Sequence, residues 1–372
     1  MATSIRFDPI RLPPETEVLR GEVRAFLAEE IAAGGFDPRG GYAAERFDRS
    51  FSRKVGAKGW IGMTWPRQYG GHERSFLERY VVTEEMLLAG APTRGHFVAD
   101  RQSGPILLRH APEDIKQDIL PRITAGECTF CIGMSEPDSG SDLFAAKTRA
   151  EPVDDGWRIN GRKVWTSSAH YADYMIGLFR TSAPADDNRR HGLTQFLVDL
   201  KAPGITIRPI QFPTGKHDFN EVVFDDLILP ADHVLGEVDM AWKQATSELA
   251  YERSGPERFL ETIEVLIELV RVLGAAPDSR GSEGIGRLVA QLHTLRRMSI
   301  SVAGMLAAGE EPMLQAAMVK DLGTNWEQAL PGLARDLAAF ADSSPTNRAT
   351  FDSVIQNATA VAPKLTIQGG TT

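Results

Sequence analysis

The nine residues MSEPDSGSD at Met134–Asp142 say more about this chain than any other stretch of it. They follow an apolar run, Phe130–Met134, that predicts a strand, and they turn through Pro137 into a tip of glycine, serine and aspartate. Turns of this composition expose backbone N–H groups and hydroxyls, which are the donors that an anionic group needs. We therefore expect this segment to hold an anionic ligand.

A second short segment, KVWTS at Lys163–Ser167, follows the pair Asn160-Gly161. An Asn-Gly pair is typical of a two-residue hairpin turn, because both positions tolerate positive φ. On the strand that leaves such a turn, alternate side chains share a face. The sequence therefore predicts a β-hairpin that places Trp165 and Ser167 on one face, an aromatic ring beside a hydroxyl.

The composition limits the classes of protein to consider. With 372 residues, of which 42% are hydrophobic and 24% charged, the chain is long enough for two or three packed domains of a soluble protein. The net charge of -9 argues against nucleic-acid binding, and Arg189-Arg190-His191 is too short a basic cluster to supply it. No apolar run reaches the roughly 20 residues of a membrane span, and the N-terminus is charged where a signal peptide is apolar. We expect a cytoplasmic protein without a membrane span.

The only cysteines, Cys128 and Cys131, form a single Cys-x-x-Cys pair. A zinc site needs two further ligands at matching spacing, and no second pair exists. A redox pair usually opens a helix, whereas this pair leads into the predicted strand. We expect two reduced, buried cysteines and no metal site.

The period of the apolar residues changes twice along the chain. It is helical in the first third, shortens to β-rich runs between about Glu127 and Leu235, and becomes helical again after Gly236. The predicted helices are 14–34, 76–88, 106–123, 240–273 with an interruption at Gly255-Pro256, 284–309 and 312–341; the predicted strands are 157–159, 163–166, 174–181, 193–200, 205–210 and 220–229.

This order of elements, together with the two motifs, resembles the acyl-CoA dehydrogenase family. The stretches Gly59–Gly71 and Phe219–Leu227 are also similar to segments of that family. The resemblance covers nearly the whole chain and implies an α+β multidomain fold. It implies an N-terminal α-helical domain at 1–125, a middle antiparallel β-domain at 126–236 with the flavin and acyl-CoA site, and a C-terminal four-helix-bundle domain at 237–372.

The resemblance also implies an activity and a cofactor. Members of the family use FAD to remove an α-proton and a β-hydride from an acyl-CoA thioester, giving a 2-enoyl thioester, and pass the electrons to an electron-transfer flavoprotein. Met134 and Ser135 match residues that hydrogen-bond the pyrimidine side of the flavin ring. Trp165 and Ser167 match residues that pack against the ring and contact its N5 side. Ser141 matches a residue near the flavin pyrophosphate or the acyl-CoA.

The catalytic base occupies one of two positions in different branches of the family. One position precedes a Gly-Thr pair in the C-terminal loop, and here that position is Gly369. The other lies on the first helix of the C-terminal domain, where this chain has Leu249-Ala-Tyr-Glu-Arg253. The resemblance therefore implies Glu252 as the base, with Arg253 beside it as a substrate-binding residue. An α-proton of a thioester is far less acidic than a carboxylic acid, so the base must be desolvated and held at the α-carbon.

Two motifs of the homotetrameric members are absent. Their Arg-x-x-Phe-Gly motif, which reaches the FAD of a neighbouring subunit, corresponds here to Asp278–Arg287, which lacks the phenylalanine. Their Gln-x-x-Gly-Gly loop has no counterpart in Asn347–Ala362. The chain thus resembles a branch that forms hetero-oligomers with an unlike subunit. The alternative is a homotetramer in which Arg280 or Arg287 takes over the contact with FAD.

Several alternatives stay open from the residues alone. The chain could be a non-catalytic or cofactor-sharing subunit of a hetero-oligomeric dehydrogenase, or a flavin monooxygenase or nitroalkane-oxidising enzyme of the same fold. Trp165 could be a core aromatic, and Ser135 and Ser167 could be solvated strand hydroxyls. Glu252 could be a helix carboxylate paired with a neighbouring arginine.

Overall fold

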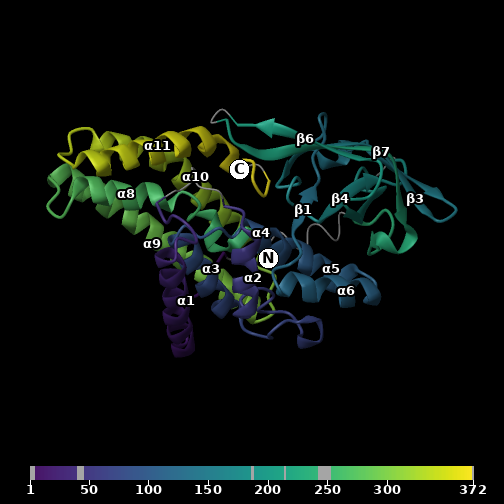
Figure 1. Cartoon of the computed structure of the whole chain (residues 1–372), viewed down its shortest axis with the longest axis horizontal. Coiled ribbons are helices and arrows are strands. Elements are labelled where there is room, and N and C mark those ends of the chain that lie inside the picture. The colour runs from purple at the N-terminus through teal and green to yellow at the C-terminus, as the bar shows by residue number, and fades with distance from the viewer. Residues whose placement is uncertain (1–4, 40–45, 186–187, 213–214, 242–252, 371–372) are drawn as a thin grey trace. The chain divides into compact units, whose positions relative to one another are not determined.

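The chain folds as helices, then a sheet, then helices again, as the sequence predicts (Figure 1). The computed structural model describes residues 5–39, 46–185, 188–212, 215–241 and 253–370. Residue contacts gather the chain into two compact units. The helical unit consists of Met1–Arg46, Arg74–Pro92 and Leu249–Thr372, and the sheet unit consists of Phe47–Glu73 and Thr93–Glu248. The predicted division into three domains at 1–125, 126–236 and 237–372 stays a prediction.

The helical unit combines two helices from the first hundred residues with the C-terminal helices. α3 begins at a capping box in which Ser75 and Glu78 satisfy each other's backbone amides. α10 packs against α8, α9 and α11 around one apolar core that includes Phe259, Trp326 and Phe351. The helices of this unit are α1 (Pro14–Ala32), α3 (Phe76–Leu88), α8 (Ile263–Leu273), α9 (Ser279–Ala307), α10 (Met313–Ala338) and α11 (Pro345–Leu365), with a short 3-10 turn at Pro256–Arg258.

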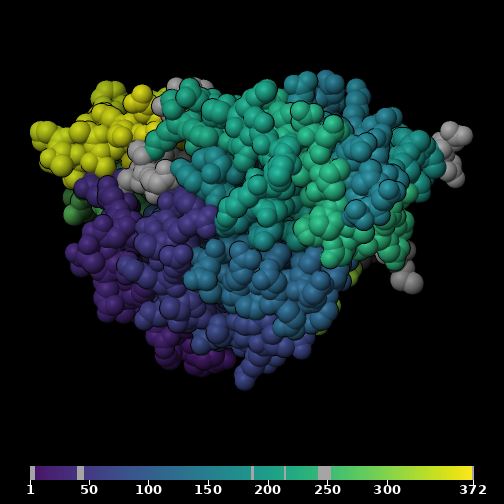
Figure 2. All heavy atoms as spheres, turned by 45° about the vertical axis from the view of Figure 1, so that its right-hand side comes forward, coloured from purple at the N-terminus to yellow at the C-terminus, as the bar shows by residue number. Residues whose placement is uncertain are grey.

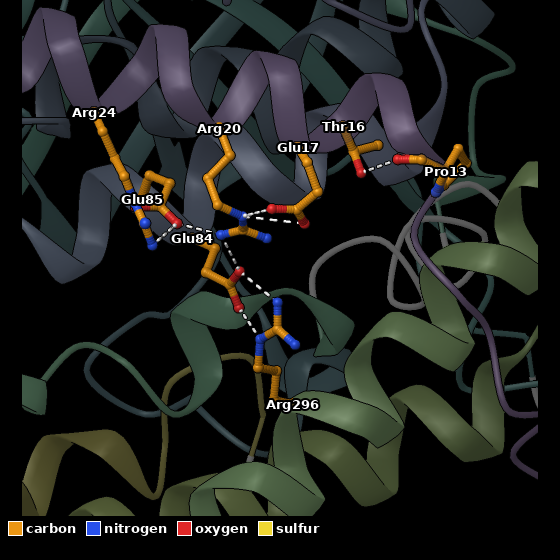
Figure 3. Close-up of polar contacts among 8 residues, drawn as sticks. All are labelled: Pro13, Thr16, Glu17, Arg20, Arg24, Glu84, Glu85 and Arg296. Atoms are coloured by element: carbon orange, nitrogen blue, oxygen red, sulfur yellow. Dashed lines mark hydrogen bonds and ion pairs between the residues drawn. The ribbon is translucent and has the colours of Figure 1, made fainter.

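Buried ion pairs join three helices of the helical unit (Figure 3). Glu84 on α3 accepts from Arg20 on α1 at 3.0 Å and from Arg296 on α9 at 2.6 Å. Glu85 pairs with Arg20 and with Arg24, the latter at 2.7 Å. The side chains of Glu84 and Glu85 are only 3% and 5% exposed, so each carboxylate needs these cations to offset its loss of hydration.

Another internal carboxylate of the helical unit lies on α10. Glu327 is fully enclosed and accepts from the backbone N–H of Thr262 at 2.9 Å. Burial, together with the negative charges of Glu261 and Glu264, raises the pKa of Glu327 to about 8. This group therefore holds its proton through most of the neutral range.

The sheet unit is built on one sheet with the strand order β6-β7-β3-β2-β4-β5-β8, and β1 pairs with β4 in parallel. Most other neighbours are antiparallel, as predicted, and Phe179, Phe196 and Phe224 fill the core. Edge strand β6 is only partly buried, and Figure 2 shows teal and green atoms of the sheet unit at the molecular surface. The strands are β1 (Phe130–Gly133), β2 (Arg149–Val153), β3 (Gly156–Ser167), β4 (Tyr174–Arg180), β5 (Leu193–Asp199), β6 (Ile205–Gln211), β7 (His217–Pro230) and β8 (Val234–Leu235).

Short helices complete the sheet unit. α4 contacts β1, and α5 contacts β8. The predicted helix at 106–123 is divided in two at Ala111-Pro112, since a proline cannot continue the hydrogen bonding of the preceding turn. The helices are α2 (Arg49–Ala57), α4 (Arg94–Val98), α5 (Gly104–His110) and α6 (Glu113–Thr124), with a 3-10 turn at Arg67–Tyr69 and a π turn at Ala99–Ser103.

The predicted hairpin turn at Asn160-Gly161 is wrong. β3 runs through both residues, and the turn that joins it to β2 is Asp154-Asp155. Asn160 exchanges two hydrogen bonds of 2.9 Å with Asp226, which lies at φ 49° in a bulge of β7. Gly161 has φ 139° and passes so close to Thr148 that a Cβ would meet it at 2.8 Å. The Asn-Gly pair therefore lies opposite a β-bulge of β7, where Asn160 bonds the bulged residue and Gly161 leaves room for Thr148.

The two cysteines are free and buried, as predicted. Burial raises the pKa of the Cys128 thiol to about 12 and that of Cys131 even further, so neither forms a thiolate near neutral pH. In the described part of the chain, no helix is long and apolar enough to cross a membrane.

Candidate functional site

The segment after β1 forms a closed turn. The backbones of Glu136 and Ser139 exchange hydrogen bonds of 2.7 and 3.1 Å across Pro137-Asp138. The hydroxyl of Ser139 donates to the carbonyl of Asp142 at 2.8 Å and closes the tip. Met134 and Ser135 are half-buried before this turn, while Ser141 is exposed at its tip.

Trp165 is presented by a bulge in β3. Lys163 pairs with Val222 and Thr166 with Asn220, so β3 carries one more residue than β7 between these pairs. Trp165 lies in this bulge at φ 58°, an unfavourable region for a bulky side chain, and it is 55% exposed. A large exposed aromatic on strained backbone excludes the core-aromatic alternative and is typical of a functional position.

Trp165 packs against one aromatic ring and lies between a buried and a half-buried part of β3. Its ring meets that of Phe219 edge-on, with centroids 5.7 Å apart. Thr166 is buried and its carbonyl accepts from Asn220 Nδ2 at 3.0 Å, whereas Ser167 is half-buried. This alternation agrees with the prediction that Trp165 and Ser167 share one side of the strand.

The two segments are held against each other at their backbones. The N–H of Val164 donates to the carbonyl of Ser135 at 2.9 Å. Lys163 Nζ, on the residue before, donates to the carbonyl of Met134 at 3.2 Å and to Glu136 Oε1 at 2.7 Å. The structure thus brings Met134, Ser135 and Trp165 into one region of the sheet unit.

Glu136 and Lys163 are site residues that sequence reasoning missed. Lys163 is fully buried, and burial lowers its pKa to about 8 although Glu136 acts in the opposite direction. Burial also opposes the charge on Glu136, but Lys163 and the amides around the carboxylate outweigh it and lower the pKa of Glu136. Near neutral pH both groups are therefore charged. A lysine at a buried position of a strand, with an acid inside the turn motif, is the pattern that could have indicated this pair.

Of the two site residues predicted in the helical unit, the structure describes Arg253. Glu252 lies outside the described residues. Arg253 Nε donates to the carbonyl of Gly369 at 2.9 Å, and a Cβ on Gly370 would lie 2.8 Å from its guanidinium. Lys320 Nζ donates to the carbonyls of Thr366 and Gly370 at 3.0 and 2.5 Å. Arg253 thus contacts the C-terminal loop. In that loop, Gly369 stands at the position where other branches of the family carry the base.

The arginines proposed to replace the missing interface motif are both exposed at the start of α9. Asp278 caps this helix by accepting from the N–H of Gly281 at 2.7 Å. Arg287 pairs with Glu283 one turn earlier at 2.6 Å. Arg280 and Arg287 are therefore placed at the surface, where a second chain can reach them.

Comparison with known proteins identifies the family. Residues 13–127 match the description "Acyl-CoA dehydrogenase, N-terminal domain", and residues 131–227 match "Acyl-CoA dehydrogenase, middle domain". Acyl-CoA dehydrogenase IpdE1 of Mycobacterium tuberculosis is 34% identical over 334 residues, 87% of this chain and 86% of that protein. The chain belongs to the acyl-CoA dehydrogenase family. The predicted family, fold class and enzyme class, an oxidoreductase, are confirmed.

Solved structures agree with this family. The structure titled "Tcur3481-Tcur3483 steroid ACAD" has a TM-score of 0.82 and 27% identity, covering 97% of this chain and 94% of that one. A chain of the ChsE4-ChsE5 complex from Mycobacterium tuberculosis has a TM-score of 0.79 and 26% identity, covering 98% and 95%. An acyl-CoA dehydrogenase from Geobacillus kaustophilus, at 22% identity and a TM-score of 0.80, shows the same fold.

Acyl-CoA dehydrogenases are flavoproteins, and the residues of the sheet unit fit a flavin. The bulge presents an exposed indole, which offers an apolar plane to a planar ring. The turn tip presents the exposed hydroxyl of Ser141, a suitable donor to an anionic group.

Proposed function

We propose that this chain catalyses the FAD-dependent α,β-dehydrogenation of an acyl-CoA thioester to a 2-enoyl-CoA and passes the electrons to an electron-transfer flavoprotein. The observation that carries the proposal is the exposed, strained Trp165 held beside Ser135 in a member of the acyl-CoA dehydrogenase family. The flavin supplies the electron acceptor for the β-hydride. The chain's own residues must then bind it, hold the thioester and remove the α-proton.

In this proposal the sheet unit holds the flavin. The backbone and hydroxyl groups of Met134 and Ser135 hydrogen-bond the pyrimidine side of the ring. Trp165 covers a face of the ring, and Ser167 contacts it near N5. Ser141, exposed at the tip of the turn, is proposed to contact the flavin pyrophosphate or the acyl-CoA, because hydroxyls and turn amides are suitable donors to phosphate.

The helical unit supplies the base. We propose Glu252, since the position in the C-terminal loop is occupied by Gly369. A carboxylate can remove an α-proton only when it is poorly hydrated and lies at the α-carbon. The contact of Arg253 with the carbonyl of Gly369 ties the residue next to Glu252 to the C-terminal loop. The substrate-binding role of Arg253 stays a prediction.

We further propose that the working assembly contains an unlike acyl-CoA dehydrogenase subunit. The FAD pyrophosphate is anionic, and its charge must be met by arginine or by backbone N–H groups. The segment Asp278–Arg287 lacks the motif that serves a neighbouring subunit in homotetramers. The titles "Tcur3481-Tcur3483 steroid ACAD" and "ChsE4-ChsE5 complex" each name two proteins, which supports a hetero-oligomer. The alternative is a homo-oligomer in which Arg280 or Arg287 meets this charge.

Expression of the chain alone and with candidate unlike subunits tests both the proposed dehydrogenase activity and the proposed hetero-oligomer. Native mass, FAD per chain and the 2-enoyl-CoA product are measured for each preparation. A straight-chain acyl-CoA and a steroid acyl-CoA serve as substrates, the latter because one structural relative is titled a steroid ACAD. We expect full FAD content and product only with an unlike subunit. A stable homo-oligomer with one FAD per chain and full activity would overturn the unlike-subunit proposal while supporting the dehydrogenase.

The non-catalytic alternative is separated by the same preparations. A silent subunit would complete the assembly without needing its own Glu252. If changing Glu252 to Gln leaves product formation by the complex unchanged, the chemistry belongs to the other subunit. Release of an oxygenated product instead of a 2-enoyl-CoA would favour the monooxygenase alternative.

A further inference from the structure

A buried ion pair, Lys163–Glu136, lies at the turn that carries Met134 and Ser135. Lys163 is 0% exposed, and its ammonium contacts both the Glu136 carboxylate and the Met134 carbonyl. One lysine therefore holds two points of the turn while it occupies the strand position just before the bulge. A shift of this side chain would move the turn and the bulge together.

The Glu136 carboxylate reaches the far end of the same loop. Its Oε2 accepts from the N–H of Lys147 at 2.6 Å, and its Oε1 accepts from the N–H of Thr148 at 3.0 Å. These amides lie just before β2, eleven and twelve residues further along the chain. One carboxylate thus closes the whole 136–148 loop, because both its oxygens are occupied by groups from the other end.

Arg180, at the end of β4, holds the middle of this loop. Its guanidinium donates to the carbonyls of Phe144 at 2.6 Å, Ala146 at 3.2 Å and His191 at 2.9 Å. Lys163 on β3 holds the carbonyl of Met134, just before the loop, and Arg180 on β4 holds carbonyls inside it. Backbone carbonyls that are shielded from water need such partners.

A buried ion pair is a poor source of stability. Removing two charges from water costs nearly as much as their attraction returns, and apolar residues of similar size often stabilise a fold as well or better. A buried pair can, however, impose one geometry, because its charges tolerate few alternative partners. The hydrogen bonds of Lys163 and Glu136 end mainly on the backbone and on each other, and the Lys163 ammonium also lies 5.5 Å from the centre of the Phe179 ring. This pattern suits a role in fixing the main chain of the turn.

We propose that Lys163 and Glu136 are positioning residues that hold the Met134–Ser135 backbone and the Trp165 bulge in the arrangement that binds the flavin. The inference rests on the proposed function, and it assigns to this pair a role beyond stability. It requires that flavin affinity and fold stability respond differently when the pair is replaced.

The test is a cycle of variants of the full chain, assembled with its unlike subunit if one is needed for FAD binding. Lys163→Met removes the donor to the Met134 carbonyl and leaves Glu136 without its cation. The double variant Lys163→Met/Glu136→Gln also removes that donor but leaves no unpaired charge. Asp173→Asn is the control, because Asp173 pairs with Arg49 at 2.9 Å in the same unit and does not contact the turn. Thermal stability without flavin, the Kd of FAD and the midpoint potential of the bound flavin are measured for each.

We expect both variants that lack Lys163 to bind FAD about 10- to 100-fold more weakly, because a displaced turn no longer aligns its hydrogen bonds with the flavin. The potential should become more negative, since a displaced turn stabilises the reduced, more negative flavin less. The double variant should recover much of the stability that Lys163→Met loses. Asp173→Asn should lower stability without changing the potential.

Two outcomes would overturn the proposal. If the double variant recovers both stability and FAD affinity, the pair only stabilises the fold. If Lys163→Met folds and binds FAD with unchanged Kd and potential, the pair does not position the site. If Lys163→Met alone does not fold, FAD affinity, midpoint potential and stability are compared in the double variant and in Glu136→Gln instead. A wild-type chain that binds no FAD would instead reject the proposed function.

Discussion

Two clusters of buried charges, one in each unit, are arranged in different ways. In the α3 cluster of the helical unit each internal carboxylate is shared between two guanidinium groups, and the ion pairs connect side chains of α1, α3 and α9 (Figure 3). In the sheet unit the Lys163–Glu136 pair connects mainly to backbone carbonyls and amides. The first arrangement joins helices that are distant in sequence, whereas the second fixes the main chain of one turn. The charges of the α3 cluster should therefore act on stability, and the Lys163–Glu136 pair on the flavin.

The largest effect is expected at the proposed base. Glu252 belongs to the helical unit but to neither charge cluster, and we expect it to act on the reaction rate rather than on stability. Glu252→Gln should preserve the fold and FAD binding but lower the rate of flavin reduction by acyl-CoA by about a hundredfold to ten-thousandfold, because general-base catalysis is lost. Rapid-mixing kinetics under anaerobic conditions measure this rate. Glu283→Gln, at an exposed glutamate of α9, is the matched control and should reduce at the wild-type rate. A Glu252→Gln variant that also does so would place the base elsewhere.

The second effect concerns stability alone. Glu84→Gln leaves Arg20 and Arg296 without their shared carboxylate, and breaking a buried pair by removing one partner costs about 3 kcal/mol. Chemical unfolding measures the loss, and FAD titration of the folded variant should give an unchanged Kd. Glu17→Gln removes an exposed partner of Arg20 and should cost less than about 1 kcal/mol. A rise in the Kd of FAD at Glu84→Gln would contradict the different roles assigned to the α3 cluster and the Lys163–Glu136 pair.

The third effect concerns the flavin alone. Trp165→Ala removes an aromatic surface worth about 1–3 kcal/mol to a ligand that packs on it, so the Kd of FAD should rise roughly 5- to 150-fold. Stability should change little, because the side chain is 55% exposed. Ile228→Ala, at a 48% exposed apolar residue of β7, controls for the loss of surface side chains. Unchanged FAD affinity in Trp165→Ala would remove this residue from the site.

The smallest effect is a pH dependence in the helical unit. The folded pKa of Glu327 is raised to about 8, above its ordinary value of 4.5, so the folded chain binds more protons than the unfolded chain between these values. Its contribution to stability is full below pH 4.5 and is lost as the pH rises through about 8. Glu327→Gln should therefore gain about 1.3 kcal/mol relative to the wild type between pH 6 and pH 7. A difference in unfolding free energy that stays constant over this range would contradict the assignment.

Sequence reasoning predicts elements that depend on local periodicity and fails where a distant partner decides. The sequence predicts the helix at 76–88 with its observed bounds, because its apolar stripe and capping box are local. The Asn160-Gly161 pair indicates a turn that the structure does not have, because only its contact with Asp226 distinguishes the two arrangements. The sequence does not predict α11, since its many threonine, asparagine and alanine residues give a weak apolar period.

The same limit applies to the site. Met134, Ser135, Trp165 and Ser167 could be named from motifs, and these residues lie on the turn and the strand predicted for them. The exposure of Trp165 depends on a mismatch between β3 and β7, which no local pattern of β3 reveals. The role of Lys163 depends on its burial and on Glu136, which precedes it by 27 residues.

Reduction of the bound flavin by an acyl-CoA, followed by visible absorption under anaerobic conditions, is the decisive measurement. The FAD-loaded assembly is mixed with a straight-chain or a steroid acyl-CoA, and both the flavin band and the acyl product are quantified. We expect the flavin band to bleach and one 2-enoyl-CoA to form for each flavin reduced. An assembly that binds FAD but keeps its oxidised spectrum with both substrates would contradict the dehydrogenase proposal, and so would a purified chain that takes up no FAD with any unlike subunit.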